Sequence, residues 1–154
     1  MELAIKGEET IEASAEALWE ALNDPEVLTR CIPGCKQMIP EGEDAYRLEM
    51  ELKVTAVRGS FGGDIALSNK VVPQSCDVTV SGSGSLGTGT GKARFELVPV
   101  DSGTTQLLYE GSGEVGGLVA GVGQRVLKSV SKHLIGKFFT ALKKDFAAKS
   151  DQAA

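Results

Sequence analysis

Residues 46–56 read YRLEMELKVTA, and this stretch decides the fold class. Every second residue is apolar, which gives the series Tyr46, Leu48, Met50, Leu52, Val54 and Ala56. The intervening residues are Arg47, Glu49, Glu51, Lys53 and Thr55. A period of two predicts a β-strand with one buried face and one face in water, as in an antiparallel sheet.

The same alternation continues on both sides of this stretch. It predicts further strands over residues 2–12, 61–72, from 76 onward, 88–100 and 104–115. Turn-forming residues separate them, such as Pro73 and Gly103. Most of the chain is therefore expected to form one antiparallel sheet.

Helix signals occur at two places. Ser14 is expected to cap a short helix, and Asp24 with Pro25 to start a second one that ends near Cys31, before the Pro33-Gly34 turn. A long helical segment is expected from about Leu118 to Lys149. Its apolar stripe is Val122, Val126, Val130, Leu134, Phe138, Leu142 and Phe146.

This order predicts an α+β protein: a curved antiparallel sheet wrapped around a long C-terminal helix, with two short helices after the first strand. One long amphipathic helix can cover the apolar face of the sheet. The 154 residues suit a single domain, expected over residues 1–149, followed by a loose tail at 150–154.

Composition narrows the function. The net charge of −5 is unlike the basic face of a nucleic-acid binder. The chain has no run of ~18 apolar residues that would span a membrane and no N-terminal secretion signal. Three cysteines fit a reducing compartment, so a cytoplasmic location is expected.

The glycine-rich stretch SGSGSLGTGTGK at 81–92 resembles a phosphate-binding loop only in its letters. Gly82, Gly84 and Gly87 match G-x-G-x-x-G, but that motif needs a helix directly after it, and a strand is expected here. A P-loop would need glycine where Leu86 stands and a hydroxyl residue where Ala93 stands. We therefore do not expect phosphate binding.

The glycines share a face with apolar residues in three strands: Gly82 and Gly84 follow Val78 and Val80, Gly89 and Gly91 precede Phe95, and Gly111 and Gly113 follow Tyr109. Either the sheet bends and packs closely at these positions, or a cavity opens above them. We expect a mainly apolar cavity. Its predicted wall is Tyr46, Leu48, Met50, Leu52, Phe61, Ile65, Leu67, Val78, Val80, Gly91, Phe95, Tyr109, Leu118, Val122 and Val126, with Cys31 and Ile32 as a lid.

Catalytic groups are scarce. The one histidine, His133, lies on the expected long helix, and Cys31 and Cys35 have a C-x3-C spacing without a second pair. No charged residue can be assigned to the inward face; Glu114 alternates outward, and Arg125 could pair with a carboxylate, meet a polar ligand group or be solvated. We expect a carrier without catalytic residues, metal or cofactor.

The segments DPEVL at 24–28 and RCIPGC at 30–35 resemble the signature of the CoxG family, named for the G subunit of carbon monoxide dehydrogenase. GVGQRVL at 121–127 and Phe138-Phe139 also fit the pattern of that family. Its superfamily is the START-like group of polyketide cyclases and lipid-transport proteins (SRPBCC), which implies a helix-grip fold over a hydrophobic cavity.

The resemblance also implies partners. It points to an accessory protein of a molybdenum hydroxylase that binds a quinone or lipid and links the enzyme to the membrane, with peripheral contact at its inner face. Some members carry a C-terminal extension that anchors them, and no such segment follows the expected long helix here. Two alternatives stay open: a cyclase or hydrolase of the same superfamily, and an assembly factor without a ligand.

Overall fold

The computed structural model describes residues 1–54 and 57–153, with side chains up to residue 148. Thr55 and Ala56, at the end of the stretch that opened the sequence analysis, lie outside the described residues. One antiparallel sheet of seven strands runs in the order β1-β7-β6-β5-β4-β3-β2. The strands are β1 (Glu2–Ile11), β2 (Cys35–Pro40), β3 (Ala45–Val54), β4 (Val57–Val71), β5 (Ser75–Gly84), β6 (Gly87–Asp101) and β7 (Thr104–Gly116).

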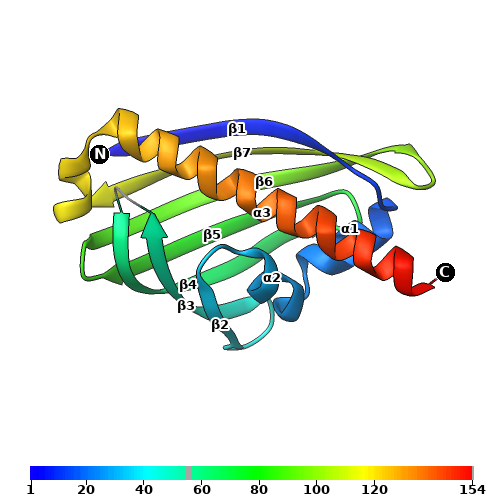
Figure 1. The fold of residues 1–154 in the computed structure, drawn as a ribbon, viewed down its shortest axis with the longest axis horizontal. Coiled ribbons are helices and arrows are strands. Elements are labelled where there is room, and N and C mark those ends of the chain that lie inside the picture. Colours follow the sequence, from blue (N-terminus) through cyan, green and yellow to red (C-terminus); the bar gives the residue numbers. More distant parts are fainter. Residues whose placement is uncertain (55–56, 154) are drawn as a thin grey trace.

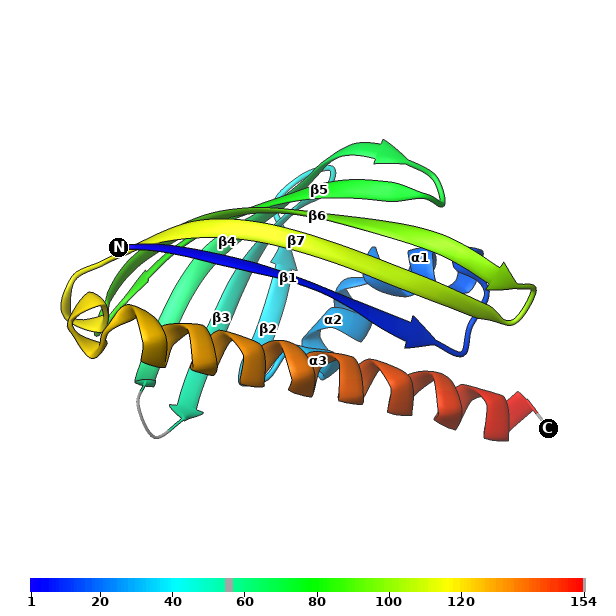
Figure 2. The same cartoon turned by 90° about the horizontal axis from the view of Figure 1, so that it is seen from above.

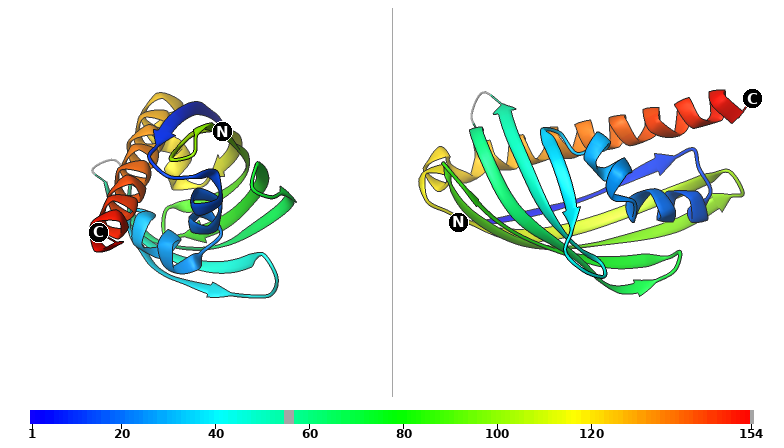
Figure 3. Two further views of the ribbon diagram at one scale, coloured as in Figure 1. Left: turned by 90° about the vertical axis from the view of Figure 1, so that its right-hand side faces the viewer. Right: turned by 90° about the horizontal axis from the view of Figure 1, so that it is seen from below.

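The sheet is curved, and the helix α3 (Gln124–Ala153) runs along its concave side (Figures 1 and 2). The short helices α1 (Ala15–Leu22) and α2 (Pro25–Cys31) close one end, as the two views of Figure 3 show. The predicted α+β architecture, a curved sheet wrapped around a C-terminal helix, is confirmed.

Both short helices begin where their capping residues predict. The Ser14 hydroxyl accepts a hydrogen bond from the Ala17 N–H at 3.1 Å, and the Asp24 carboxylate accepts one from Glu26 N–H at 2.9 Å. These caps satisfy N–H groups that the first helical turn leaves without partners. Pro25 occupies the first turn of α2, where its lack of an N–H costs nothing.

Three features differ from the sequence expectation. Strand β2 at the sheet edge was not predicted. The expected helix from Leu118 is divided at Gly123, with the 3-10 helix η1 (Leu118–Val122) before α3. At its far end α3 continues to Ala153, through residues expected to form a loose tail. Gly123 has φ +101°, which an α-helix cannot accommodate, and this explains the division.

The core is concentrated at the end of the sheet near α1 and α2. Ile11, Leu18 and Leu142 are fully buried there, and Trp19 packs against Phe95 with ring centroids 5.9 Å apart. No helix among the described residues is both long and apolar enough to cross a bilayer.

Candidate functional site

The inner face of the sheet, meaning the face toward α3, is arranged in rows by the strand register. Tyr109 marks this face because its ring contacts Phe139 of α3. One row joins Gly7, Tyr109, Phe95 and Cys76; the next joins Ile5, Gly111, Ala93, Val78 and Leu67. A third contains Leu3, Gly113, Gly91, Val80, Ile65 and Tyr46, and a fourth contains Val115, Gly89, Gly82, Gly63 and Leu48.

The structure brings the strand residues of the predicted cavity wall together on this face. They are Tyr46, Leu48, Met50, Leu52, Phe61, Ile65, Leu67, Val78, Val80, Gly91, Phe95 and Tyr109. The three helical candidates lie elsewhere. Leu118 and Val122 belong to η1, where Leu118 is 75% exposed, and Val126 in the first turn of α3 is 40% exposed. Leu118 is therefore not brought against the inner face.

The inner face has a packed end and an open end. Near α1 and α2, Leu97 and Leu107 are 3% and 2% exposed. Three rows further along, Val80 is 42% exposed although it points toward the side on which α3 lies. Side chains fill the space under the second half of α3, and the glycine-containing rows remain accessible under the first half.

The glycines of these rows serve two different purposes. A Cβ built on Gly113 would lie 2.7 Å from the Thr90 carbonyl oxygen, and one on Gly63 would overlap the Ser81 carbonyl oxygen. Glycine is required there because neighbouring backbones approach closely in a bent sheet. At Gly89 a Cβ would meet only the Glu114 carbonyl oxygen, at 3.7 Å, which is ordinary contact. The sheet does not require glycine at position 89, so its effect is to leave space on the inner face.

A cavity of about 860 Å³ adjoins the row of Ile5, Gly111, Ala93 and Val78. The residues that flank this row in each strand also line it, and α3 contributes two lysines. These further lining residues include Ala4, Lys6, Asp77, Thr79, Lys92, Arg94, Glu110, Ser112, Lys128 and Lys132. The volume lies in the range that proteins use to hold small organic molecules.

A second hollow, of about 630 Å³, opens between α3 and strand β3. Leu52 and Val54 of β3 line it together with Leu134 of α3 and the Pro33-Gly34 turn. We call this hollow the mouth. The mouth lies beside the CIPGC segment, so this sequence motif has a definable place in the structure.

The CIPGC segment forms a tight connection from α2 to the sheet. Ile32 ends α2, and the Cys35 N–H donates back to the Ile32 carbonyl at 3.1 Å. Gly34 has φ +74°, and its carbonyl accepts a hydrogen bond from the Glu51 N–H at 2.9 Å. The turn is therefore fixed against β3 at the edge of the mouth.

The predicted lid residues Cys31 and Ile32 lie at this connection. Cys31 is 3% exposed and belongs to the core, and it also lines a groove that runs between α2 and α3. An ion pair joins the two helices nearby: Arg30 donates to the Asp145 carboxylate from Nη2 at 3.0 Å and from Nε at 3.1 Å. This pair holds α2 against α3.

One charged residue does lie on the inner face, which corrects the sequence analysis. Glu9 pairs with Leu107 across the strands and shares its face, and its carboxylate contacts the Lys143 ammonium of α3 at 2.9 Å. Alternation in β1 could have revealed it, because Leu3, Ile5, Gly7, Glu9 and Ile11 follow one another at every second position.

Three further reactive groups are Tyr109 on the inner face and Cys35 and His133, which both line the mouth. Burial raises the pKa of the Tyr109 hydroxyl and Glu9 adds to that effect, so this group stays protonated. Burial likewise raises the pKa of the Cys35 thiol. His133 is exposed on α3. Within residues 1–54 and 57–148, no three His, Cys, Asp or Glu side chains gather as metal ligands would.

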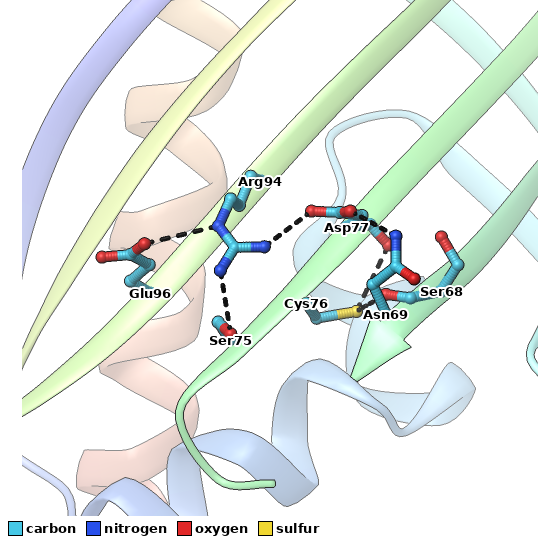
Figure 4. Close-up of polar contacts among 7 residues, drawn as sticks. All are labelled: Ser68, Asn69, Ser75, Cys76, Asp77, Arg94 and Glu96. Atoms are coloured by element: carbon cyan, nitrogen blue, oxygen red, sulfur yellow. Dashed lines mark hydrogen bonds and ion pairs between the residues drawn. The ribbon is translucent and has the colours of Figure 1, made fainter. Parts of the chain in front are cut away.

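A polar network on the convex face is drawn in Figure 4. Arg94 contacts Asp77 at 3.1 Å, Glu96 at 3.3 Å and the Ser75 hydroxyl at 3.2 Å. Hydrogen bonds from Asn69 and then from Arg94 lower the pKa of the Asp77 carboxyl. These contacts tie β5 to β6, and Asp77 and Arg94 are also among the residues that line the cavity of about 860 Å³.

Three solved structures resemble this fold over nearly its whole length. A conserved protein from Geobacillus kaustophilus is 35% identical, with a TM-score of 0.92, over 95% of this chain and 96% of that one. A START superfamily protein from Mycobacterium smegmatis is 18% identical, with a TM-score of 0.74, over 98% and 99%. The ZhuI aromatase/cyclase from Streptomyces sp. R1128 is 12% identical, with a TM-score of 0.66, over 99% and 95%.

The curved sheet, the gripped helix and these likenesses define a helix-grip protein with the START-like fold. The sequence model for CoxG, the G subunit of carbon monoxide dehydrogenase, matches residues 7–147. The chain belongs to this CoxG family. No curated protein matches the sequence significantly.

Proposed function

We propose that this protein is a non-catalytic accessory subunit of a molybdenum hydroxylase. It holds a quinone or another lipid between the sheet and α3, and it links the enzyme to the membrane that supplies this molecule. The family name describes a subunit of carbon monoxide dehydrogenase, which supports the partnership.

The observation that carries the ligand proposal is the space over Gly89. Val115 lies opposite this position on β7 and Val80 lies diagonally across on β5, yet only one sheet carbonyl oxygen comes within contact distance of a Cβ built there. Apolar surface that faces inward without a protein partner gains about 25 cal/mol per Å² when a ligand covers it, before the costs of association.

The distribution of polar and apolar residues in the cavity indicates which parts of the ligand are polar and which are apolar. The floor row has only apolar side chains and glycine, whereas lysines line the α3 side. A molecule with an extended apolar body and a small polar head suits this division, because the body replaces water on the sheet and the head stays near the lysines.

Native mass spectrometry of the protein purified from its own host tests the proposal. A quinone or lipid that co-purifies in near-stoichiometric amount supports it, and organic extraction identifies the molecule. The stripped protein should also take up added menaquinone or ubiquinone.

Two outcomes would redirect the assignment. A clean apo mass without quinone uptake, together with tight binding to the hydroxylase, would indicate an assembly factor. A ligand that leaves with altered mass would indicate an enzyme of the cyclase type.

A further inference from the structure

Two lysines of α3 lie on the side of the helix that faces the sheet. Lys128 and Lys132 share one stripe with Ile135 and Phe139, at successive spacings of four, three and four residues. Phe139 is buried and stacks on Tyr109 of the inner face, so this stripe is directed toward the sheet. An amphipathic helix ordinarily has apolar residues on such a stripe. Here the stripe changes from apolar to basic where the inner face changes from its packed end to its open end.

Both lysines line the cavity of about 860 Å³ from the α3 side. Both are exposed, and in the part of the chain that the structure describes neither forms an ion pair. Glu9, an acid on the inner face, contacts Lys143 instead and does not line this cavity. Like charges four residues apart on a helix repel each other. An anion between the two ammonium groups would relieve that repulsion.

The acids that line the cavity are directed away from these lysines. Asp77 and Glu110 precede the residues Val78 and Gly111 of the inner face in their strands. Successive side chains of a strand point to opposite faces, so both carboxylates lie on the convex face. Asp77 is also held there by Arg94 at 3.1 Å. A ligand on the inner face therefore meets the positive charge of α3 without meeting these two carboxylates.

The surface opposite the lysines is apolar. Its floor is the row of Ile5, Gly111, Ala93 and Val78, which join neighbouring strands. Ala93 is exposed although it lies on the inner face, so part of the floor is accessible to a ligand. Apolar surface gains free energy when an apolar group removes it from water. The cavity thus combines an apolar floor with a pair of cations above it.

We propose that Lys128 and Lys132 determine the specificity of this cavity, and that they select an amphiphile with an anionic head over a neutral one. The apolar chain lies along the floor, and the head, a carboxylate or a phosphate, lies between the two ammonium groups. The inference rests on the proposed function, since it takes the cavity to hold a lipid, and it narrows that lipid to an acidic one.

Lysine suits either anionic head. Its ammonium is a compact charge with three donors on a flexible stem, whereas arginine offers a rigid fork that favours two-point contacts. The pair Lys128 and Lys132 therefore sets the sign of the head more strictly than its shape. This is why the test includes a carboxylate and a phosphate.

Isothermal titration calorimetry tests the selection with probes that share one alkyl chain, namely decanoate, decyl phosphate and decan-1-ol. The test variant is Lys128→Gln/Lys132→Gln. The matched control is Lys137→Gln/Lys144→Gln, which removes the same charge from exposed positions of α3 that do not line this cavity. Lys137 follows Lys128 by about two and a half helical turns, so it lies on the opposite side of α3.

The wild-type protein should bind both anionic probes at least about tenfold more tightly than decan-1-ol, as expected for hydrogen bonds to charged groups. The Lys128→Gln/Lys132→Gln variant should lose this preference and keep its affinity for decan-1-ol within about twofold, because the floor is unchanged. The control should keep the preference. Added salt should weaken decanoate binding and leave decan-1-ol binding unchanged. A variant with disturbed packing would instead weaken all three probes.

Decanoate and decyl phosphate binding no more tightly than decan-1-ol would overturn the selection. Equal losses in the two double variants would overturn it as well. Where the selection holds, the tighter of the two anionic probes shows whether the head is that of a fatty acid or of a phosphate lipid.

Quinone uptake, measured separately on the same proteins, distinguishes this inference from the proposed function. Quinone uptake without binding of either anionic probe would overturn the inference and leave the carrier function standing. Failure of the protein to take up quinone or any of the three probes would overturn both.

Discussion

The ring of Tyr109 on β7 stacks on the ring of Phe139 on α3, with centroids 5.4 Å apart and ring planes inclined by 29°. This pair marks the boundary between the packed end and the open end of the inner face. Gly7 is the opposite residue on β1, and a Cβ built there would overlap the Tyr109 hydroxyl. The boundary therefore depends on a glycine in a neighbouring strand.

Gly7→Ala should destabilise the protein, because the added methyl group displaces the Tyr109 ring from Phe139. The expected cost is about 1–3 kcal/mol in the free energy of unfolding, as for other overpacked cores. Denaturant titration measures it. In a Tyr109→Leu background the same substitution should cost much less, and an equal cost in both backgrounds would show that the ring is not the cause.

Gly89→Leu should lower quinone affinity at least tenfold without unfolding the protein, because the new side chain occupies the space above the glycine rows. Thr90→Leu is the matched control, since it adds the side chain to the neighbouring residue on the convex face. Quinone titration monitored by native mass spectrometry measures both. Unchanged affinity in Gly89→Leu would place the ligand elsewhere. We choose position 89 over the predicted wall residue Gly91, where a Cβ would lie 3.2 Å from Val80.

Gly34→Ala should destabilise the connection between α2 and β2, which packs against β3. Gly34 has φ +74°, and a Cβ there would overlap the Glu51 carbonyl oxygen. Backbone strain of this kind costs about 1–3 kcal/mol. Hydrogen exchange at the Glu51 amide, which donates to the Gly34 carbonyl, should accelerate in the variant.

Gly136→Ala is a useful counterpart within α3. No atom lies within 4 Å of a Cβ built at this position, so the substitution should stabilise the protein by about 0.5–1 kcal/mol. If both glycine variants lost stability equally, the effect at Gly34 could not be assigned to its backbone conformation.

The Cys35 thiol should react slowly with iodoacetamide near neutral pH. Burial raises its pKa above the ordinary value, and this outweighs the opposing hydrogen bonds from Thr29 and Gln37. The thiolate is the reactive form, so its fraction at a given pH is smaller than in a free cysteine, and the rate should keep rising at pH values where free cysteine has levelled off. Peptide mass spectrometry follows the modification. Rapid alkylation at pH 7 would instead indicate an activated thiol.

The sequence predicts the architecture well wherever a local signal is strong. The alternation from Tyr46 establishes β3, and the Asp24-Pro25 pair marks the start of α2. Strand β2 was missed because it is a short edge strand, mostly exposed, with a register shift between Cys35 and Gln37 that removes its alternation.

The site was harder to predict than the fold. Alternation assigns a residue to a face, which was enough to group the strand residues of the predicted wall. It does not show which end of that face the helix fills. It also does not separate Gly63, which a bent sheet requires, from Gly89, which leaves space. That distinction depends on the distance between neighbouring backbones, which only the assembled sheet defines.

The placement of β1 beside β7 has a consequence for how the protein is made. Ile11 pairs with Thr105, so the sheet cannot be completed until most of the chain has left the ribosome. At typical rates of synthesis roughly 5–20 s separate residue 11 from residue 105, and for that time β1 has no strand partner. Folding dominated by such long-range pairing is slow, and the nascent protein should depend on chaperones more than a helical bundle of the same length.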